Sequence, residues 1–264
     1  MGKWQNIQAE TSDKIAVLTI DHPPVNSFNA QVVTELEQAI EDLTADDEVK
    51  VIIITGGGER AFVAGADIPE IKEQFTSPDT ASVADFVGRG HRTFLKIERS
   101  LKPIIAAING FCLGGGMELA MACHMRVCSD KARLGLPEIT LGIIPGWGGT
   151  QRLPRLANKG QAIELILTGD MISAQEAYRL GLVNKVVPDG SALEEARDLA
   201  RKIASKSKFP IAAAMRAITK GLELSLEDGL KLEAEQFAVL RGKRDPIEGI
   251  NAFLEKRTAE FEDR

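Results

Sequence analysis

The chain lacks any long hydrophobic run. None of its apolar stretches approaches the roughly 20 residues that a membrane-spanning helix needs. The polar first 14 residues lack the apolar core of a secretory signal. With 44% hydrophobic and 27% charged residues, the composition is that of an ordinary globular protein. We therefore expect a cytoplasmic protein that has no membrane partner.

Cysteine and histidine are both scarce. The three cysteines, Cys112, Cys123 and Cys128, include no CxxC pair, which argues against a disulfide framework or a zinc site. Their apolar neighbours favour buried thiols instead. The three histidines lack the spacing of metal ligands. We therefore expect no metal site.

The chain also lacks a basic stripe and a phosphate-binding loop. Its formal net charge is −6, and the longest basic block is the short stretch at 241–244. Nucleic acid is therefore not the expected partner, because such binding depends on clustered Lys and Arg. No GxxxxGK[ST] is present, and no GxGxxG follows a strand, which argues against ATP and nicotinamide cofactors.

Strand-like and helix-like segments alternate in the first half. Residues 15–20, 51–54 and 104–108 are short apolar runs rich in β-branched residues, as in strands buried on both faces. Between the first two, residues 32–43 have helical spacing, and Asn29 is a suitable cap. Strands separated by helices predict largely parallel pairing.

The last third has the pattern of a helical segment. We expect the sheet-rich part to span residues 1–200 and a helical segment to span 201–264. We predict helix N-caps at Ser173, Ser191, Ser225 and Asp245, each followed within three residues by an acidic side chain. Between the strand-like runs at 51–54 and 104–108, residues 74–82 have the composition of a mobile loop.

The densest chemistry lies around the glycine triplet Gly114 to Gly116. It follows the 104–108 strand and precedes a helical stretch, so backbone N–H groups should point outward at the helix start. Such groups can stabilise an oxyanion. Glu118 lies in the first helical turn, where it could simply complement the helix dipole. Glu138 lies among apolar residues, where it is either at a loop rim or desolvated with a raised pKa. Spacing alone leaves these alternatives open.

Residues 106–120 (AAINGFCLGGGMELA) closely resemble the central signature of the crotonase superfamily. The resemblance extends to residues 61–68 (AFVAGADI), 136–139 (LPEI), 141–145 (LGIIP) and 148–153 (GGTQRL). It spans nearly the whole chain in the expected order. The resemblance implies an α/β fold with a spiral core of repeated ββα units and a C-terminal helical segment that drives trimerisation, usually into a dimer of trimers.

The resemblance also implies a site for an acyl-CoA thioester, with no cofactor other than the coenzyme A of the substrate. By motif position, the backbone N–H groups of Ala66 and Gly115 form the oxyanion hole. Glutamates at both catalytic positions, Glu118 and Glu138, are typical of the family's hydratases. The implied reaction is hydration of a 2-enoyl-CoA, with Glu118 as general base on water and Glu138 as proton donor to C2.

Two other functions remain open at this point. One is a different crotonase reaction on acyl-CoA, either double-bond isomerisation or hydration of a cyclic or dienoyl thioester. The other is RNA binding, which some hydratase-like proteins perform and which the negative net charge disfavours.

The contacts to substrate and coenzyme A are expected from motif position as well. The expected residues are Ala64, Asp67, Ile68, Trp147, Phe253 and Lys256. Of these, Asp67 should cap the next helix, and Lys256 matches a lysine that reaches CoA phosphate from a neighbouring subunit in relatives. Trp147 stands where a smaller residue is common beside the acyl chain. We assign Arg152 to a structural hydrogen-bond network. The chain departs from the family where Pro69 replaces a common lysine and where the turn at 24–26 is one residue shorter.

Overall fold

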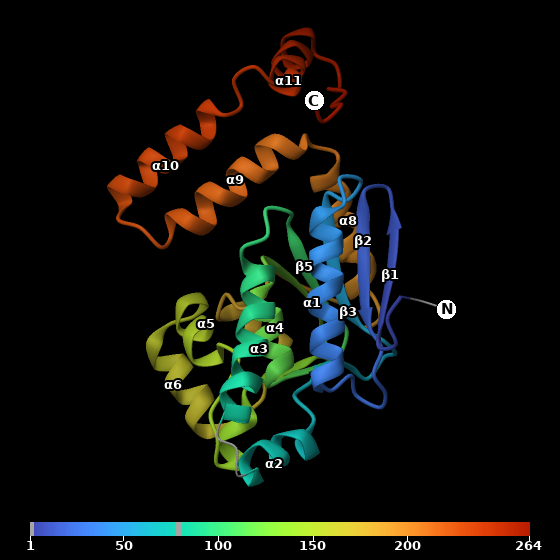
Figure 1. Ribbon diagram of the computed structural model, residues 1–264. Coiled ribbons are helices and arrows are strands. Elements are labelled where there is room, and N and C mark those ends of the chain that lie inside the picture. The colour runs from blue at the N-terminus through green and yellow to red at the C-terminus, as the bar shows by residue number, and fades with distance from the viewer. Residues whose placement is uncertain (1–2, 78–80) are drawn as a thin grey trace.

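Two sheets form the centre of the computed structural model, which describes residues 3–77 and 81–264 (Figure 1). The larger sheet contains, in spatial order, β1 (Ile7–Ser12), β2 (Ile15–Ile20), β3 (Val51–Gly56), β5 (Ile104–Ile108), β7 (Met125–Ser129) and β10 (Lys185–Val187). The smaller sheet contains β4 (Ala61–Ala64), β6 (Phe111–Leu113), β8 (Arg133–Gly135) and β9 (Ile172–Ser173). Pairing is parallel except for β1 with β2 and β8 with β9.

The chain repeats one supersecondary unit along these sheets. Strand β3 lies in the larger sheet and β4 in the smaller one, and the pairs β5–β6 and β7–β8 repeat this step. Helical segments follow the pairs, namely α2 (Ile68–Thr76) with α3 (Ala81–Glu98), α4 (Gly115–Ala122), and η1 (Pro137–Leu141). This succession is the predicted spiral of ββα units, and the α/β fold class is confirmed.

The larger sheet is buried on both faces. Alternate residues such as Ile52 and Ile54 join the main core, which α1 (Ala30–Ala45) and α3 cover. The intervening Val51 and Ile53 face α8 (Ala192–Ala204), whose alanines at every fourth position permit close approach. Asn29 caps α1 as predicted, because its side chain accepts a hydrogen bond from the N–H of Val32 (2.8 Å).

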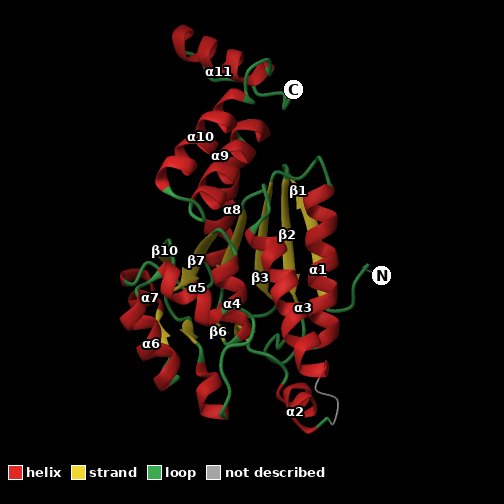
Figure 2. Ribbon diagram, turned by 60° about the vertical axis from the view of Figure 1, so that its left-hand side comes forward, coloured by secondary structure: helices red, strands yellow, loops and turns green. Residues whose placement is uncertain are grey.

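All elements after β10 are helical in the described chain. Helices α5 (Gly149–Leu156), α6 (Lys159–Thr168) and α7 (Ala174–Arg179) precede that strand and flank the smaller sheet. After α8 come α9 (Lys208–Gly221), α10 (Leu226–Ala238) and α11 (Arg244–Glu255). Figure 2 shows α9 and α10 packed side by side beyond the sheets, with α11 farther out.

Three of the four N-caps predicted in the last third of the chain are confirmed in position, and two of them make the capping hydrogen bond. The side chains of Ser173 and Ser225 accept hydrogen bonds from the N–H groups of Glu176 and Asp228, each at the third helical position. Ser191 precedes α8, but its side chain makes no cap hydrogen bond. Asp245 is not a cap: it is the second residue of α11, whose N-cap is Lys243.

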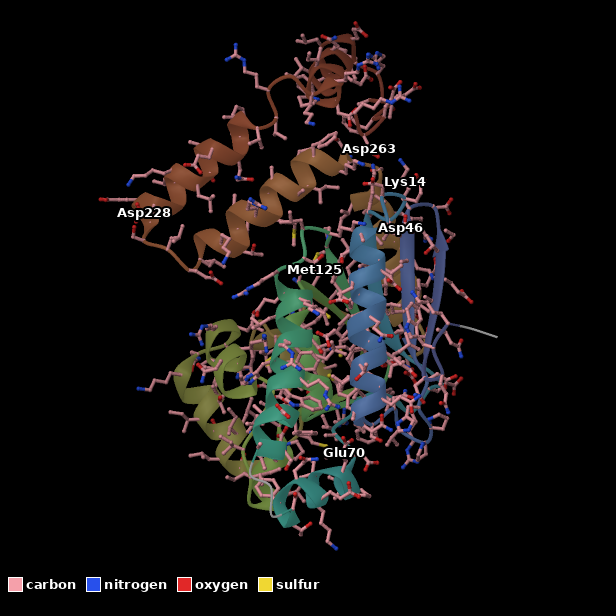
Figure 3. All side chains as sticks on the ribbon, in the orientation of Figure 1. Lys14, Asp46, Glu70, Met125, Asp228 and Asp263 are labelled. Atoms are coloured by element: carbon pink, nitrogen blue, oxygen red, sulfur yellow. The ribbon has the colours of Figure 1, made fainter. Side chains whose placement is uncertain are left out.

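The Asp245 side chain is used by the C-terminal tail. Its carboxylate accepts hydrogen bonds from the N–H groups of Glu262 (3.0 Å) and Asp263 (2.9 Å). Asp263 in turn forms ion pairs with Lys14 (3.0 Å) and the buried Lys50 (2.7 Å), so the tail lies against the β1–β2 turn (Figure 3). The cap prediction was wrong because a contact distant in sequence occupies the carboxylate.

Of the described residues in the predicted loop at 74–82, all except Ser77 are helical. Helix α2 continues to Thr76 and α3 begins at Ala81, while 78–80 lie outside the described residues. Among the helices of the described residues, none is long and apolar enough to cross a membrane. The three cysteines are buried free thiols, as predicted.

Candidate active site

A cavity of about 720 Å³ opens between α2, α3, the start of α4, η1 and the turn before α5. Seven residues predicted from motif position line it: Ala64, Ala66, Ile68, Gly115, Glu118, Glu138 and Trp147. Residues from four separate segments of the sequence therefore meet at one pocket. Its remaining wall is mostly apolar.

Ala66 and Gly115 each present a backbone N–H that has no partner among the described residues. Ala66 follows Gly65, whose φ is +96°. The β-bridge between Phe28 and Ala66 does not use the Ala66 N–H. In it, the N–H of Phe28 donates to the carbonyl of Gly65 (2.9 Å), and the N–H of Asp67 donates to the carbonyl of Phe28 (2.7 Å). Gly115 is the first residue of α4, so its N–H has no intrahelical acceptor.

The glycine triplet lets α4 begin directly against its neighbours. A Cβ at Gly116 would lie 2.1 Å from the carbonyl oxygen of Val63 in β4. A Cβ at Gly115 would lie 2.9 Å from the Trp147 ring. Gly114 has a φ of +50°, which favours glycine. Close approach to β4 is what brings the start of α4 beside Ala66.

Glu118 is held from the turn at 147–149. Its Oε1 accepts hydrogen bonds from the N–H groups of Trp147 (2.8 Å) and Gly149 (2.7 Å). The residue is only 2% exposed. Oε2 accepts no hydrogen bond from the described residues, so it is available to a water molecule or substrate.

Glu138 reaches the same pocket from η1, but without such support. Its Oε2 is buried and has no hydrogen-bond partner among the described residues. Its Oε1 lies beside the glycine triplet, 2.9 Å from the position of a Cβ on Gly114. The backbone N–H of Glu138 itself stabilises the charged carboxylate, but burial of Oε2 without a donor outweighs it and favours the protonated form. The sequence left open whether Glu138 lies at a loop rim or is desolvated, and the buried Oε2 supports desolvation.

The environment raises the pKa of both carboxyls. Burial and the neighbouring Glu138 raise the pKa of Glu118 to about 7, against the N–H groups of Gly149 and Trp147 and the charge of Arg152, which lower it. Burial raises the pKa of Glu138 to about 7. Both carboxyls can therefore exchange protons near neutral pH, which suits one general base and one general acid.

Trp147 fills the space between α3 and α4. Its indole is 3% exposed and packs on the rings of Phe28, Phe86 and Phe94, at centroid distances of 5.0–5.8 Å. A Cβ at Gly90 of α3 would lie 2.2 Å from the indole. Trp147 thus walls the pocket beside Gly115 with its side chain and holds Glu118 with its backbone.

Three predicted contacts do not reach this cavity. Asp67 caps α2 by accepting a hydrogen bond from the N–H of Glu70 (3.0 Å), as expected, and it does not line the pocket. Phe253 and Lys256 belong to α11 and its C-cap, at the opposite end of the molecule from α2 (Figure 1). Within a single chain, α11 therefore adds nothing to the pocket.

Sequence reasoning missed the wall formed by α2 and α3. Ile71 and Phe75 of α2 and Phe86, Val87 and His91 of α3 line the cavity. The signal was present, because the apolar residues of α3 recur at helical spacing. Among the described residues, no group of three or more His, Cys, Asp or Glu side chains could hold a metal ion.

The spiral of ββα units is the architecture of crotonase-fold enzymes. The chain belongs to the enoyl-CoA hydratase/isomerase family, whose model matches residues 10–264. It is 41% identical over 259 residues to a crotonyl-CoA hydratase of Syntrophomonas wolfei subsp. wolfei, covering 98% of both chains. It is 42% identical over 256 residues to a short-chain-enoyl-CoA hydratase of Clostridium acetobutylicum, covering 97% of both.

A solved structure is similar over the same extent. The crystal structure of an enoyl-CoA hydratase from Bacillus anthracis superposes with a TM-score of 0.93 at 39% identity. The superposition covers 98% of this chain and 100% of that chain.

Proposed function

We propose that this protein is an enoyl-CoA hydratase, which adds water across the 2,3 double bond of a 2-enoyl-CoA thioester to give a 3-hydroxyacyl-CoA. The observation that carries the proposal is the pair Glu118 and Glu138, which meet in one pocket beside the free N–H groups of Ala66 and Gly115. The full-length similarity to relatives named as hydratases supports the same reaction.

The two N–H groups act on the thioester carbonyl. Addition at C3 moves electron density onto the carbonyl oxygen, and the amides of Ala66 and Gly115 stabilise that enolate. Removal of one such donor typically lowers turnover by about 10²–10³. The dipole of α4 adds to the effect because Gly115 is the first residue of that helix.

The carboxyls divide the proton transfers. Glu118 accepts a proton from water through its free Oε2, and the water oxygen forms a bond to C3. Glu138 donates its proton to C2 as the enolate collapses. The two transfers leave Glu118 protonated and Glu138 ionised, and passage of one proton from Glu118 to Glu138 restores the starting state. Holding one water between both carboxyls implies syn addition.

We also propose that the protein acts as a trimer, which can pair into a dimer of trimers. The helices α9, α10 and α11 expose many large apolar side chains, among them Ile218, Leu222, Leu226, Phe237, Phe253 and Leu254. Such a surface on an isolated chain is typical of a protein interface. In this assembly, Lys256 and Phe253 contact the coenzyme A bound to a neighbouring copy.

The function is tested with crotonyl-CoA and the purified protein. We expect loss of the conjugated-thioester absorbance and formation of 3-hydroxybutyryl-CoA, identified by chromatography against a standard. A 3-enoyl product formed without the 3-hydroxyacyl product would assign the site to isomerisation instead. No reaction with crotonyl-CoA or with longer, branched and cyclic 2-enoyl thioesters would refute the proposal.

A further inference from the structure

The orientation of the Glu118 carboxylate depends on one short turn. Both amides that hold its Oε1 belong to residues 147 and 149, immediately before and at the start of α5. A displacement of this turn would move both donors together. The groups that fix the turn therefore decide where the carboxylate points.

Arg152 is the side chain that braces this turn. Its Nη1 donates to the carbonyl of Trp147 (2.9 Å), and its backbone N–H donates to the carbonyl of Gly148 (2.8 Å). A Cβ at Gly148 would lie 2.2 Å from Nη1, so the guanidinium lies directly against the turn. Its Nε and Nη2 donate to the Glu98 carboxylate of α3 at 3.3 and 2.9 Å.

Arg152 also brings charge to the site. Glu118 faces Glu138 of η1 and Arg152 of α5, while Arg152 faces Glu98 of α3 and the thiol of Cys123. Burial and Glu138 raise the pKa of Glu118, and the Arg152 guanidinium lowers it. Arg152 is itself only 8% exposed, so solvent screens this interaction weakly.

We propose that Arg152, braced by Glu98, is a positioning residue that fixes the turn at 147–149 and keeps Glu118 in the carboxylate form that accepts the proton of water. It lies outside the residues that line the pocket and acts through Glu118. The inference rests on the hydratase function proposed above and extends the structural network expected for Arg152.

The test compares Arg152→Gln, Arg152→Lys and the matched control Arg155→Gln. Arg155 lies on the same helix, is exposed, and donates only to Gln151 among the described residues. In Arg152→Gln we expect the acidic limb of the pH profile of kcat/KM to move up by about one pH unit. At a pH below that limb, kcat should fall about tenfold while KM stays within about twofold.

The direction of the expected pH shift follows from the positive charge that Arg152→Gln removes. Without the guanidinium, the pKa of Glu118 rises, so the base is ionised only at higher pH. Arg152→Lys keeps a positive charge but loses the paired hydrogen bonds to Glu98. The acidic limb of its pH profile should therefore stay near that of the wild type, while kcat is reduced. Arg155→Gln should behave as the wild type in both respects.

A titration that does not depend on turnover separates this inference from the proposed function. The Glu118 carboxyl is followed by ¹³C NMR in glutamate-labelled protein and assigned by its loss in Glu118→Gln. A higher titration midpoint in Arg152→Gln supports the inference even if crotonyl-CoA proves a poor substrate. A lower melting temperature with an unchanged Glu118 midpoint and an unchanged pH limb would show a merely structural role and overturn it.

Discussion

Glu118 and Glu138 have the same side chain in two different surroundings. Two N–H donors hold Oε1 of Glu118, whereas Oε2 of Glu138 is buried with no donor among the described residues. Hydrogen bonds to the charged form favour ionisation, and burial without them favours protonation. The surroundings, not the residue type, therefore support the proposed roles of Glu118 as base and Glu138 as acid.

Replacing Glu138 with Gln should stabilise the protein at alkaline pH. Its pKa is about 7 in the folded state against 4.5 ordinarily, so the folded state binds more protons between these values. The stability associated with the proton is fully present below about pH 4.5 and is lost as pH rises through about 7. We expect Glu138→Gln to raise the free energy of unfolding at pH 8 by about 1–3 kcal/mol.

Urea denaturation of both proteins at pH 8 and pH 4.5 measures the effect. The difference should be largest at pH 8 and close to zero at pH 4.5. A difference that does not change with pH would show that Glu138 is not protonated preferentially in the fold.

Seven of the pocket residues were predicted from the motifs that resemble the crotonase signature, but their surroundings were not predictable. Glu118 receives its hydrogen bonds from residues 29 and 31 positions later. Such contacts depend on the packing of α5 against α4, which no local pattern encodes. The desolvation of Glu138 was open for the same reason, since apolar neighbours in sequence do not establish burial.

At the scale of elements, the packing of α4 on β4 brings the two proposed oxyanion donors together. Gly116 makes this packing possible, because any Cβ there would meet the backbone carbonyl of Val63 at 2.1 Å. Backbone cannot yield as a flexible side chain can, so α4 would have to move away from β4. Such a movement separates Gly115 from Ala66.

Gly116→Ala should therefore lower both stability and turnover. We expect a loss of about 1–3 kcal/mol from overpacking. We expect a drop in kcat of about 10²-fold, comparable to loss of one oxyanion donor. Thermal unfolding and the crotonyl-CoA assay measure the two effects.

Gly160→Ala on α6 is the matched control. The nearest atom to a Cβ there is 3.5 Å away, an ordinary contact, so this change should be neutral or slightly stabilising. A fully active Gly116→Ala variant would contradict the requirement for close packing of α4.

Local sequence patterns predicted the N-caps of helices only where no residue distant in sequence binds the capping side chain. Asn29, Ser173 and Ser225 cap their helices through neighbours three positions ahead. Asp245 had an equally suitable local pattern, but its carboxylate binds the amides of residues 262 and 263. Tertiary hydrogen bonds override local capping when they satisfy buried groups.

At the scale of the molecule, the C-terminal helices combine a polar anchor with an apolar exterior. Asp263 binds Lys14 and the buried Lys50, which ties the chain end to the larger sheet. Beyond that anchor, α10 leaves Leu226 (80% exposed) and Phe237 (79% exposed) uncovered. The proposed trimer would remove this surface from water.

The double variant Leu226→Glu with Phe237→Glu should dissociate that assembly. Light scattering coupled to size exclusion should give the mass of one chain for the variant and of three or six chains for the unmodified protein. Leu167→Glu on α6, which replaces a 63% exposed residue outside the C-terminal helices, is the control and should not change the mass. A monomeric unmodified protein would contradict the proposed assembly.

The most direct test of the carboxylate pair is turnover of crotonyl-CoA by Glu118→Gln and Glu138→Gln, with the exposed Glu164→Gln as control. Both pocket variants should lose about 10²–10⁴-fold in kcat, because each lacks one proton-transfer group. The control should retain wild-type turnover. Near-normal turnover by either pocket variant, in protein that unfolds as cooperatively as the wild type, would contradict the account of hydration by a shared pair of carboxyls.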